Sequence, residues 1–248
     1  LNEAGPPLRV EVINGGCQGY STFESLVNLS LRMVDLEPDL VVVYHAINDA
    51  RCALWPRVER DNTHWRALWP IERTSALERL LSRSTTWLLL KGLDPAWKAG
   101  RSGDLGWYAI VGYPAEDWKL SPSAELGFAS VRRNLESIVA VSRGHGAQVV
   151  LGLQAMRWSD LDRFGTKEAQ VEGLRRVLQI TREVGGELDV PVVDLAAPLE
   201  AEAERQRVAD GKDTVFTSEV HLTNEGADLL ARTLAQSILE LGLVRQAR

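Results

Sequence analysis

Three residues of the chain have the types and positions that a carbonyl reaction would need. Gly19 lies in the glycine-rich segment INGGCQGYST, Asn48 ends the apolar segment VVVYHAIN, and His221 lies in SEVHLT near the other end of the chain. Acyl transfer needs a base that takes the proton of the nucleophile, and donors that stabilise the oxyanion. A glycine N–H and an asparagine amide can be the donors, and histidine, with an ordinary pKa of about 6.5, suits the base.

These segments resemble blocks two, three and five of the SGNH (GDSL-type) hydrolases, a superfamily of serine esterases and lipases. The resemblance covers residues 10–223 apart from an insert, and it makes Gly19 and Asn48 oxyanion-hole donors and His221 the general base. It implies an α/β fold, a three-layer sandwich with a parallel, flavodoxin-like sheet. It also implies a carboxylic-ester hydrolase (esterase, lipase or deacetylase-like) that works through a serine acyl-enzyme without a metal or cofactor.

One departure from the family pattern concerns the nucleophile. The family's block one reads Gly-Asp-Ser, but in this chain Gly103 and Asp104 are followed by Leu105. We therefore expect the nucleophilic serine outside this chain, and we expect the chain to be N-terminally truncated.

A second departure concerns the group that orients the base. Block five reads Asp-x-x-His in the family, whereas Ser218 stands three residues before His221. The orienting group is open between Ser218, Glu219, Asp213, a backbone carbonyl and a water. A serine–histidine pair without the acid would still work, though less efficiently, because the acid mainly sets the tautomer and orientation of the imidazole.

Each segment also has a simpler interpretation. The glycine-rich loop could be an ordinary turn or hold a phosphate at a helix N-terminus, although it does not fit G-x-G-x-x-G. Asn48 could be a loop residue, and His221 could cap or pack against a helix. His45 and Tyr20 are weaker candidates for substrate contacts. The rival function is a non-catalytic glycan- or lipid-binding protein on the same fold.

The elements that must position these residues alternate along the chain. Ser21 and Glu24 form an S-x-x-E capping box, which predicts a helix start. Apolar runs predict strands at 8–14, 40–44, 148–153 and 190–194, and helical periodicity predicts helices at 124–143, 166–184 and 224–241. Asp194, at a strand end, is a candidate cap for a helix from Leu195 onward or, as the alternative, a carboxylate at the edge of the site. Strands that alternate with long helices predict a parallel sheet with helices on both faces.

A tryptophan-rich region interrupts this alternation. Residues 50–121 contain seven of the eight tryptophans, with one amphipathic helix expected at 75–90. We interpret the region as an insert within a single SGNH-hydrolase-like domain that covers residues 1–248.

Composition excludes several classes of protein. The net charge is -6, the pI is about 5.4 and no Lys/Arg run occurs, so we expect no nucleic-acid partner. The two cysteines and four histidines have no metal-ligand spacing. No segment reaches the roughly 20 apolar residues of a spanning helix. The expected partner is a small-molecule, glycan or lipid ester, while the sequence indicates no membrane contact and leaves open the oligomeric state and the localisation, secreted or membrane-anchored included.

The resemblance also predicts which strand the chain lacks. In the related fold, the strand order 2-1-3-4-5 places the serine-bearing strand between those expected at 8–14 and 40–44. Without it, both strands would expose unpaired backbone groups, at about 1–3 kcal/mol each if buried. We therefore expect residues 1–248 alone to be unstable.

Overall fold

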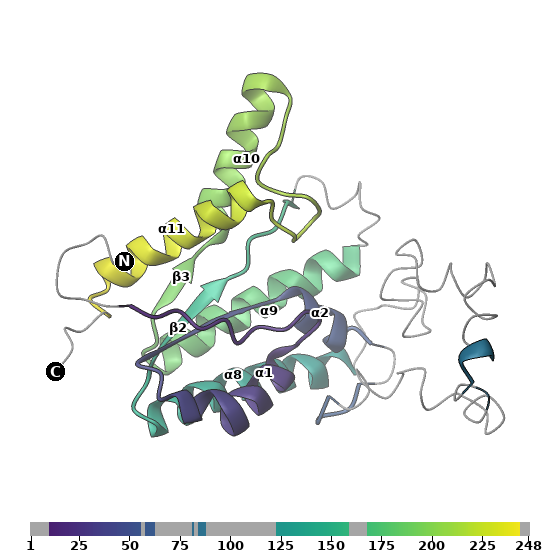
Figure 1. Ribbon diagram of the computed structural model, residues 1–248, viewed down its shortest axis with the longest axis vertical. Helices are drawn as coiled ribbons and strands as arrows, with labels where there is room; N and C mark the ends of the chain where they lie inside the picture. Colours follow the sequence, from purple (N-terminus) through teal and green to yellow (C-terminus); the bar gives the residue numbers. More distant parts are fainter. Residues whose placement is uncertain are drawn as a thin grey trace.

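A parallel β-sheet lies at the centre of the protein in the computed structural model (Figure 1). Its strands, in the order β1-β2-β3, are β1 (Leu40–His45), β2 (Gln148–Leu153) and β3 (Val192–Asp194). β1 and β2 are in parallel register along their whole lengths, and β3 pairs with the second half of β2. Their nearly continuous apolar sequences suit a sheet that is covered on both faces.

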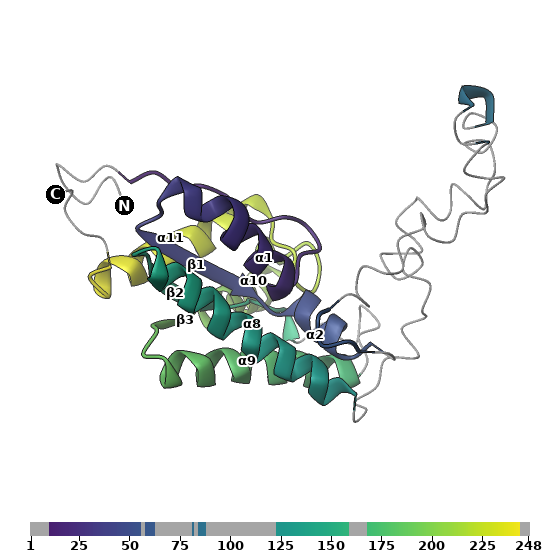
Figure 2. The same ribbon diagram turned by 90° about the horizontal axis from the view of Figure 1, so that it is seen from below.

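Helices cover both faces of this sheet. They are α1 (Thr22–Asn28), α2 (Ile47–Ala53), α8 (Ala124–Gly144), α9 (Glu168–Glu187), α10 (Ala196–Asp210) and α11 (Asn224–Glu240). Along β2, Val149 and Leu151 face the core under α8 and α9, whereas Val150 faces residues of α11. Figure 1 shows α10 and α11 above the sheet, and Figure 2 shows α8 and α9 side by side on the other face. The predicted α/β three-layer sandwich is confirmed.

The structure describes residues 10–55, 58–62, 81, 84–87, 123–158 and 168–243. Most of the predicted insert at 50–121, most of the helix expected at 75–90 and five of the insert's seven tryptophans lie outside the described residues. The division into a domain and an insert stays a prediction. Among the described residues, no helix combines the length and apolar character that crossing a membrane requires.

The strand predicted at 8–14 is wrong for the part that the structure describes. Residues 10–14 form no β-ladder, and the side chains of Val12 and Ile13 are 83% and 54% exposed. The physical reason is that a strand needs a hydrogen-bonded neighbour, and no described strand lies beside this segment. Residues 10–14 and β1 are not paired with each other, and the expected instability of residues 1–248 stays a prediction.

Two helices at the carboxyl edge of the sheet hold the candidate site. α1 begins at the predicted capping box: Ser21 Oγ accepts a hydrogen bond from Phe23 N at 3.3 Å, and Glu24 accepts one from Ser21 N at 2.7 Å. α2 packs tightly against α8, because Gly127 has no side chain and a Cβ there would lie 2.4 Å from Ala53 Cα. This close packing holds the carboxyl-terminal end of α2, the helix whose first turn contains Asn48.

Candidate active site

The segments with Gly19 and Asn48 meet beyond the carboxyl ends of the strands. Asn48 lies in the first turn of α2, just after β1, and its Nδ2 donates a hydrogen bond to the carbonyl oxygen of Tyr20 at 2.9 Å. The segment after β2 joins them, since Gln154 Oε1 accepts a hydrogen bond from Ile47 N at 2.8 Å. Ligand crevices of open parallel sheets lie at this edge.

Among the described residues, the amide nitrogen of Asn48 has one hydrogen-bond acceptor. Its Nδ2 has two hydrogens, of which the carbonyl of Tyr20 accepts one, and no second acceptor occurs within the described part of the chain. Gly19, which precedes Tyr20, has φ of +80°, a left-handed conformation that favours glycine. The predicted donors are therefore held by adjacent backbone and a direct hydrogen bond.

His221 lies exposed in the loop between α10 and α11, and its ring contacts Ser218. Nδ1 of His221 lies 2.7 Å from Ser218 Oγ, and the backbone N–H of His221 donates to the same oxygen at 3.3 Å. The carbonyl of His221 accepts from Thr217 N at 2.8 Å, which closes a tight loop. When Nδ1 has the proton and donates it to Ser218, Nε2 is the free acceptor that a general base needs.

The other two candidate orienting groups are paired with arginines. Asp213 forms an ion pair with Arg157, and its Oδ1 accepts the backbone N–H of Val215 at 2.8 Å. Glu219 lies 3.3 Å from Arg51 Nη2. Of Ser218, Glu219 and Asp213, Ser218 is the one whose contact with the imidazole appears among the described hydrogen bonds.

The histidine loop docks on α2. Arg51, which pairs with Glu219, lies one helical turn after Asn48, and Glu219 lies two residues before His221. The carbonyl of Glu219 also accepts from Arg157 N at 2.9 Å, in the segment after β2. The structure therefore joins the loop of His221 to the helix of Asn48 at one edge of the sheet.

A buried polar network anchors the start of α2 from the other side. The fully buried Asp49 accepts hydrogen bonds from Thr22 N at 2.9 Å and Thr22 Oγ1 at 2.6 Å. Its other oxygen lies 3.5 Å from His45 Nδ1, while His45 Nε2 lies 2.9 Å from Ser25 Oγ. Burial raises the pKa of Asp49, against the opposing effects of His45 and the Thr22 hydrogen bonds. Both ring nitrogens of His45, a candidate for substrate contact, thus have partners.

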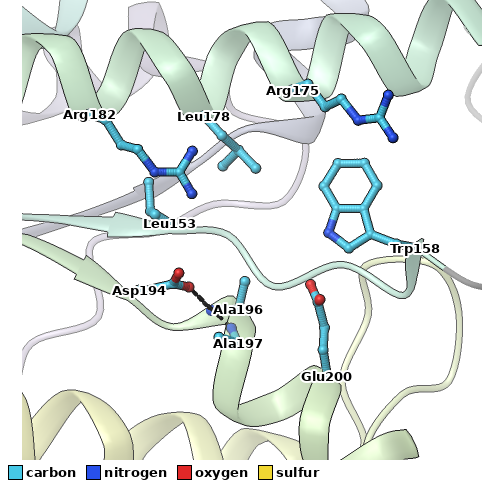
Figure 3. A pocket seen from close by; sticks show the side chains of 9 residues that line it. All are labelled: Leu153, Trp158, Arg175, Leu178, Arg182, Asp194, Ala196, Ala197 and Glu200. Atoms are coloured by element: carbon cyan, nitrogen blue, oxygen red, sulfur yellow. Dashed lines mark hydrogen bonds between the residues drawn. The ribbon is translucent and has the colours of Figure 1, made fainter.

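A cavity of about 260 Å³ opens at the carboxyl ends of β2 and β3. Figure 3 shows Arg175 and Arg182 from α9 on one side, with Asp194 and Glu200 facing them from the other. Trp158 lies at one end of the cavity, and the Arg175 guanidinium carbon is 5.7 Å from its ring centroid. Sequence reasoning named Asp194 as a possible carboxylate at the edge of the site, but it missed the two arginines, which stand seven residues apart, two turns along one helix face.

Two carboxylates of this cavity have further roles. Asp194 Oδ1 accepts hydrogen bonds from Ala196 N at 3.0 Å and Ala197 N at 3.1 Å, as the predicted cap of the following helix would. Burial raises the pKa of Glu200, and the charge of Asp194 raises it further, while hydrogen bonds from Met156 and Trp158 act in the opposite direction.

A family model described as the GDSL-like Lipase/Acylhydrolase family matches residues 1–229 of the chain. The protein belongs to this family. Membership confirms the resemblance drawn from the three segments and supports a hydrolase of ester substrates in general. A comparison with curated proteins found no significant match. Within the described residues of this GDSL-like protein, no group of three or more His, Cys, Asp or Glu side chains could hold a metal ion.

Proposed function

We propose that this protein is a carboxylic-ester hydrolase that acts through a serine acyl-enzyme, with His221 as general base and Gly19 and Asn48 as oxyanion donors. The observation that supports this most directly is the docking of the His221 loop, through Glu219 and Arg51, on the helix whose first turn contains Asn48. The base and an amide donor thereby belong to one edge of the sheet, although they are far apart in sequence.

The proposed reaction has two halves. The serine hydroxyl attacks the ester carbonyl carbon while Nε2 of His221 takes its proton, and the carbonyl oxygen becomes an oxyanion. The N–H of Gly19 and the spare amide hydrogen of Asn48 stabilise that oxyanion. The imidazolium then gives its proton to the leaving alcohol, and the acyl group stays on the serine. In the second half, water attacks the acyl-enzyme with His221 as its base. The carboxylic acid is released and the serine is regenerated.

Ser218 is the proposed orienting group of His221. Its Oγ accepts a hydrogen bond from the protonated Nδ1 of His221, and this contact keeps Nε2 unprotonated and directed away from Ser218. A neutral hydroxyl sets the tautomer as a carboxylate would, but it gives less stabilisation to the imidazolium that forms during attack.

The test uses the protein from the complete gene and short p-nitrophenyl esters. Wild type is expected to hydrolyse them and to be labelled at one serine by a fluorophosphonate. His221→Ala should lower turnover by several orders of magnitude, because the base is lost. A folded His221→Ala protein with wild-type turnover would show that another group is the base.

The alternative is a non-catalytic glycan- or lipid-binding protein. The cavity of Figure 3 supports it, because an indole with charged groups around it can contact both the apolar face and the hydroxyls of a sugar. If the complete protein neither hydrolyses esters nor reacts with the fluorophosphonate, yet binds a glycan or lipid in calorimetry, the alternative replaces the hydrolase.

A further inference from the structure

We infer that the Arg51–Glu219 ion pair is a positioning contact that fixes the His221 loop on the helix that presents Asn48. The inference rests on the proposed function and adds two residues to it. Arg51 Nη2 and Glu219 Oε1 lie 3.3 Å apart, and the two side chains are only 16% and 18% exposed. Their separation in sequence is 168 residues, so the contact joins two distant parts of the fold.

The two charges lie close to the proposed catalytic groups along the chain. Residues three apart in a helix lie on the same face, so Arg51 stands one turn beyond Asn48. Glu219 precedes His221 by two residues within a short loop whose ends are joined by a bridge between Phe216 and Leu222. A shift of Glu219 therefore moves the imidazole relative to the Asn48 amide.

Besides this pair, the loop is held by the buried side chain of Val220, which joins the main core, and by Arg157. Arg157 contacts the loop twice: its backbone N–H donates a hydrogen bond to the carbonyl of Glu219 at 2.9 Å, and its side chain forms an ion pair with Asp213. Those contacts tie the loop to the segment after β2. Among the described ion pairs, Arg51–Glu219 is the one that ties it to α2.

The pair is expected to act on turnover more than on binding. The two groups face each other, so loss of either one leaves the substrate contacts in place but lets the base drift from its working geometry. A misplacement of about 1 Å can reduce turnover by about 10²-fold. If Arg51 instead contacted the substrate, its loss would raise KM. A variant with the two charges exchanged between positions 51 and 219 would then not recover activity.

The experiment compares four variants of the complete protein: Arg51→Met, Glu219→Gln, the double Arg51→Met/Glu219→Gln, and the charge-reversed Arg51→Glu/Glu219→Arg. Each single variant is expected to lower kcat by about 10- to 100-fold with KM changed less than about threefold. The double variant should lose no more than the worse single, because both remove one contact. The reversed pair should recover at least part of kcat.

A fifth variant, Arg51→Lys, keeps the positive charge and should retain more activity than Arg51→Met. It serves as the test if Arg51→Met does not fold.

Arg132→Met is the matched control, because Arg132 pairs with Glu187 at 2.8 Å between α8 and α9, away from the histidine loop. It should leave kcat unchanged. Wild-type kcat in the folded singles, losses that add in the double, or a rise in KM alone would overturn the inference while the proposed function stands. An inactive wild type, or an active His221→Ala protein, would instead overturn the proposed function and this inference with it.

Discussion

His221 Nδ1 and Ser218 Oγ lie 2.7 Å apart, so a hydroxyl contacts the ring nitrogen that the family's aspartate would be expected to contact. The same serine oxygen accepts the backbone N–H of His221 at 3.3 Å, which fixes both residues within one turn of chain. Asp213 and Glu219 are paired with arginines, so the nearby carboxylates stabilise the loop through other contacts.

Ser218→Asp is therefore expected to preserve or raise kcat at neutral pH. A carboxylate at this position accepts a hydrogen bond from Nδ1–H as the hydroxyl does, and in addition its charge stabilises the imidazolium. Ser218→Ala is the control and should lower kcat by about 5- to 10-fold, the equivalent of one hydrogen bond of about 1 kcal/mol. Steady-state kinetics on a short ester measure both. A tenfold or greater fall in a folded Ser218→Asp protein would mean that another group already orients the ring.

Asn48→Ala is expected to lower kcat by about 10²–10³, the usual effect of one oxyanion donor. The variant also loses the hydrogen bond to the Tyr20 carbonyl, so its melting temperature must be measured beside its kinetics. Asn48→Asp keeps the side-chain shape but removes the donor, and should lose as much activity. Turnover within threefold of wild type in either folded variant would exclude Asn48 from the oxyanion hole.

Local sequence signals predicted the regular elements well. The apolar period placed a helix at 124–143, against the observed Ala124–Gly144, and the strand at 148–153 coincides with β2. The capping box of Ser21 and Glu24 is formed as expected. Each of these signals depends on residues that are close in sequence, which is why they could be read without a structure.

Features that depend on distant partners could not be predicted. α2 has no side-chain cap at Ala46 and is short, so its helix depends on packing against α8 and α9. The segment at 10–14 alternates like a strand, but alternation cannot supply the neighbour that a strand requires. The contact between Arg51 and Glu219 spans 168 residues and has no local signature.

The buried carboxyl of Asp49 predicts a specific dependence of stability on pH. Burial raises its pKa in the folded state, so between the unfolded and folded pKa values the native protein binds more protons than the unfolded chain. The stability that this group contributes is present below the unfolded pKa of about 3.9 and is lost as pH rises through the folded pKa. Asp49→Asn removes this titration, and its amide oxygen can still accept from Thr22.

Chemical denaturation at several pH values between about 4 and 8 tests this. The free energy of unfolding of wild type minus that of Asp49→Asn should fall as pH rises. A difference that grows with pH would show that the pairing of Asp49 with His45 outweighs burial.

Gly127→Ala is expected to destabilise the fold by about 1–3 kcal/mol through overpacking between α8 and α2. The new Cβ would lie 2.4 Å from Ala53 Cα and 2.7 Å from Ala53 Cβ, so one helix must move. Because α2 begins with the Asn48 turn, activity should fall as well. Gly144→Ala is the matched control in the same helix, since nothing lies within 4 Å of its added Cβ. Its free energy of unfolding should exceed that of wild type by no more than about 1 kcal/mol, because alanine favours a helix over glycine. Urea denaturation of the three proteins measures the difference, and equal midpoints for Gly127→Ala and wild type would contradict the close approach of the two helices.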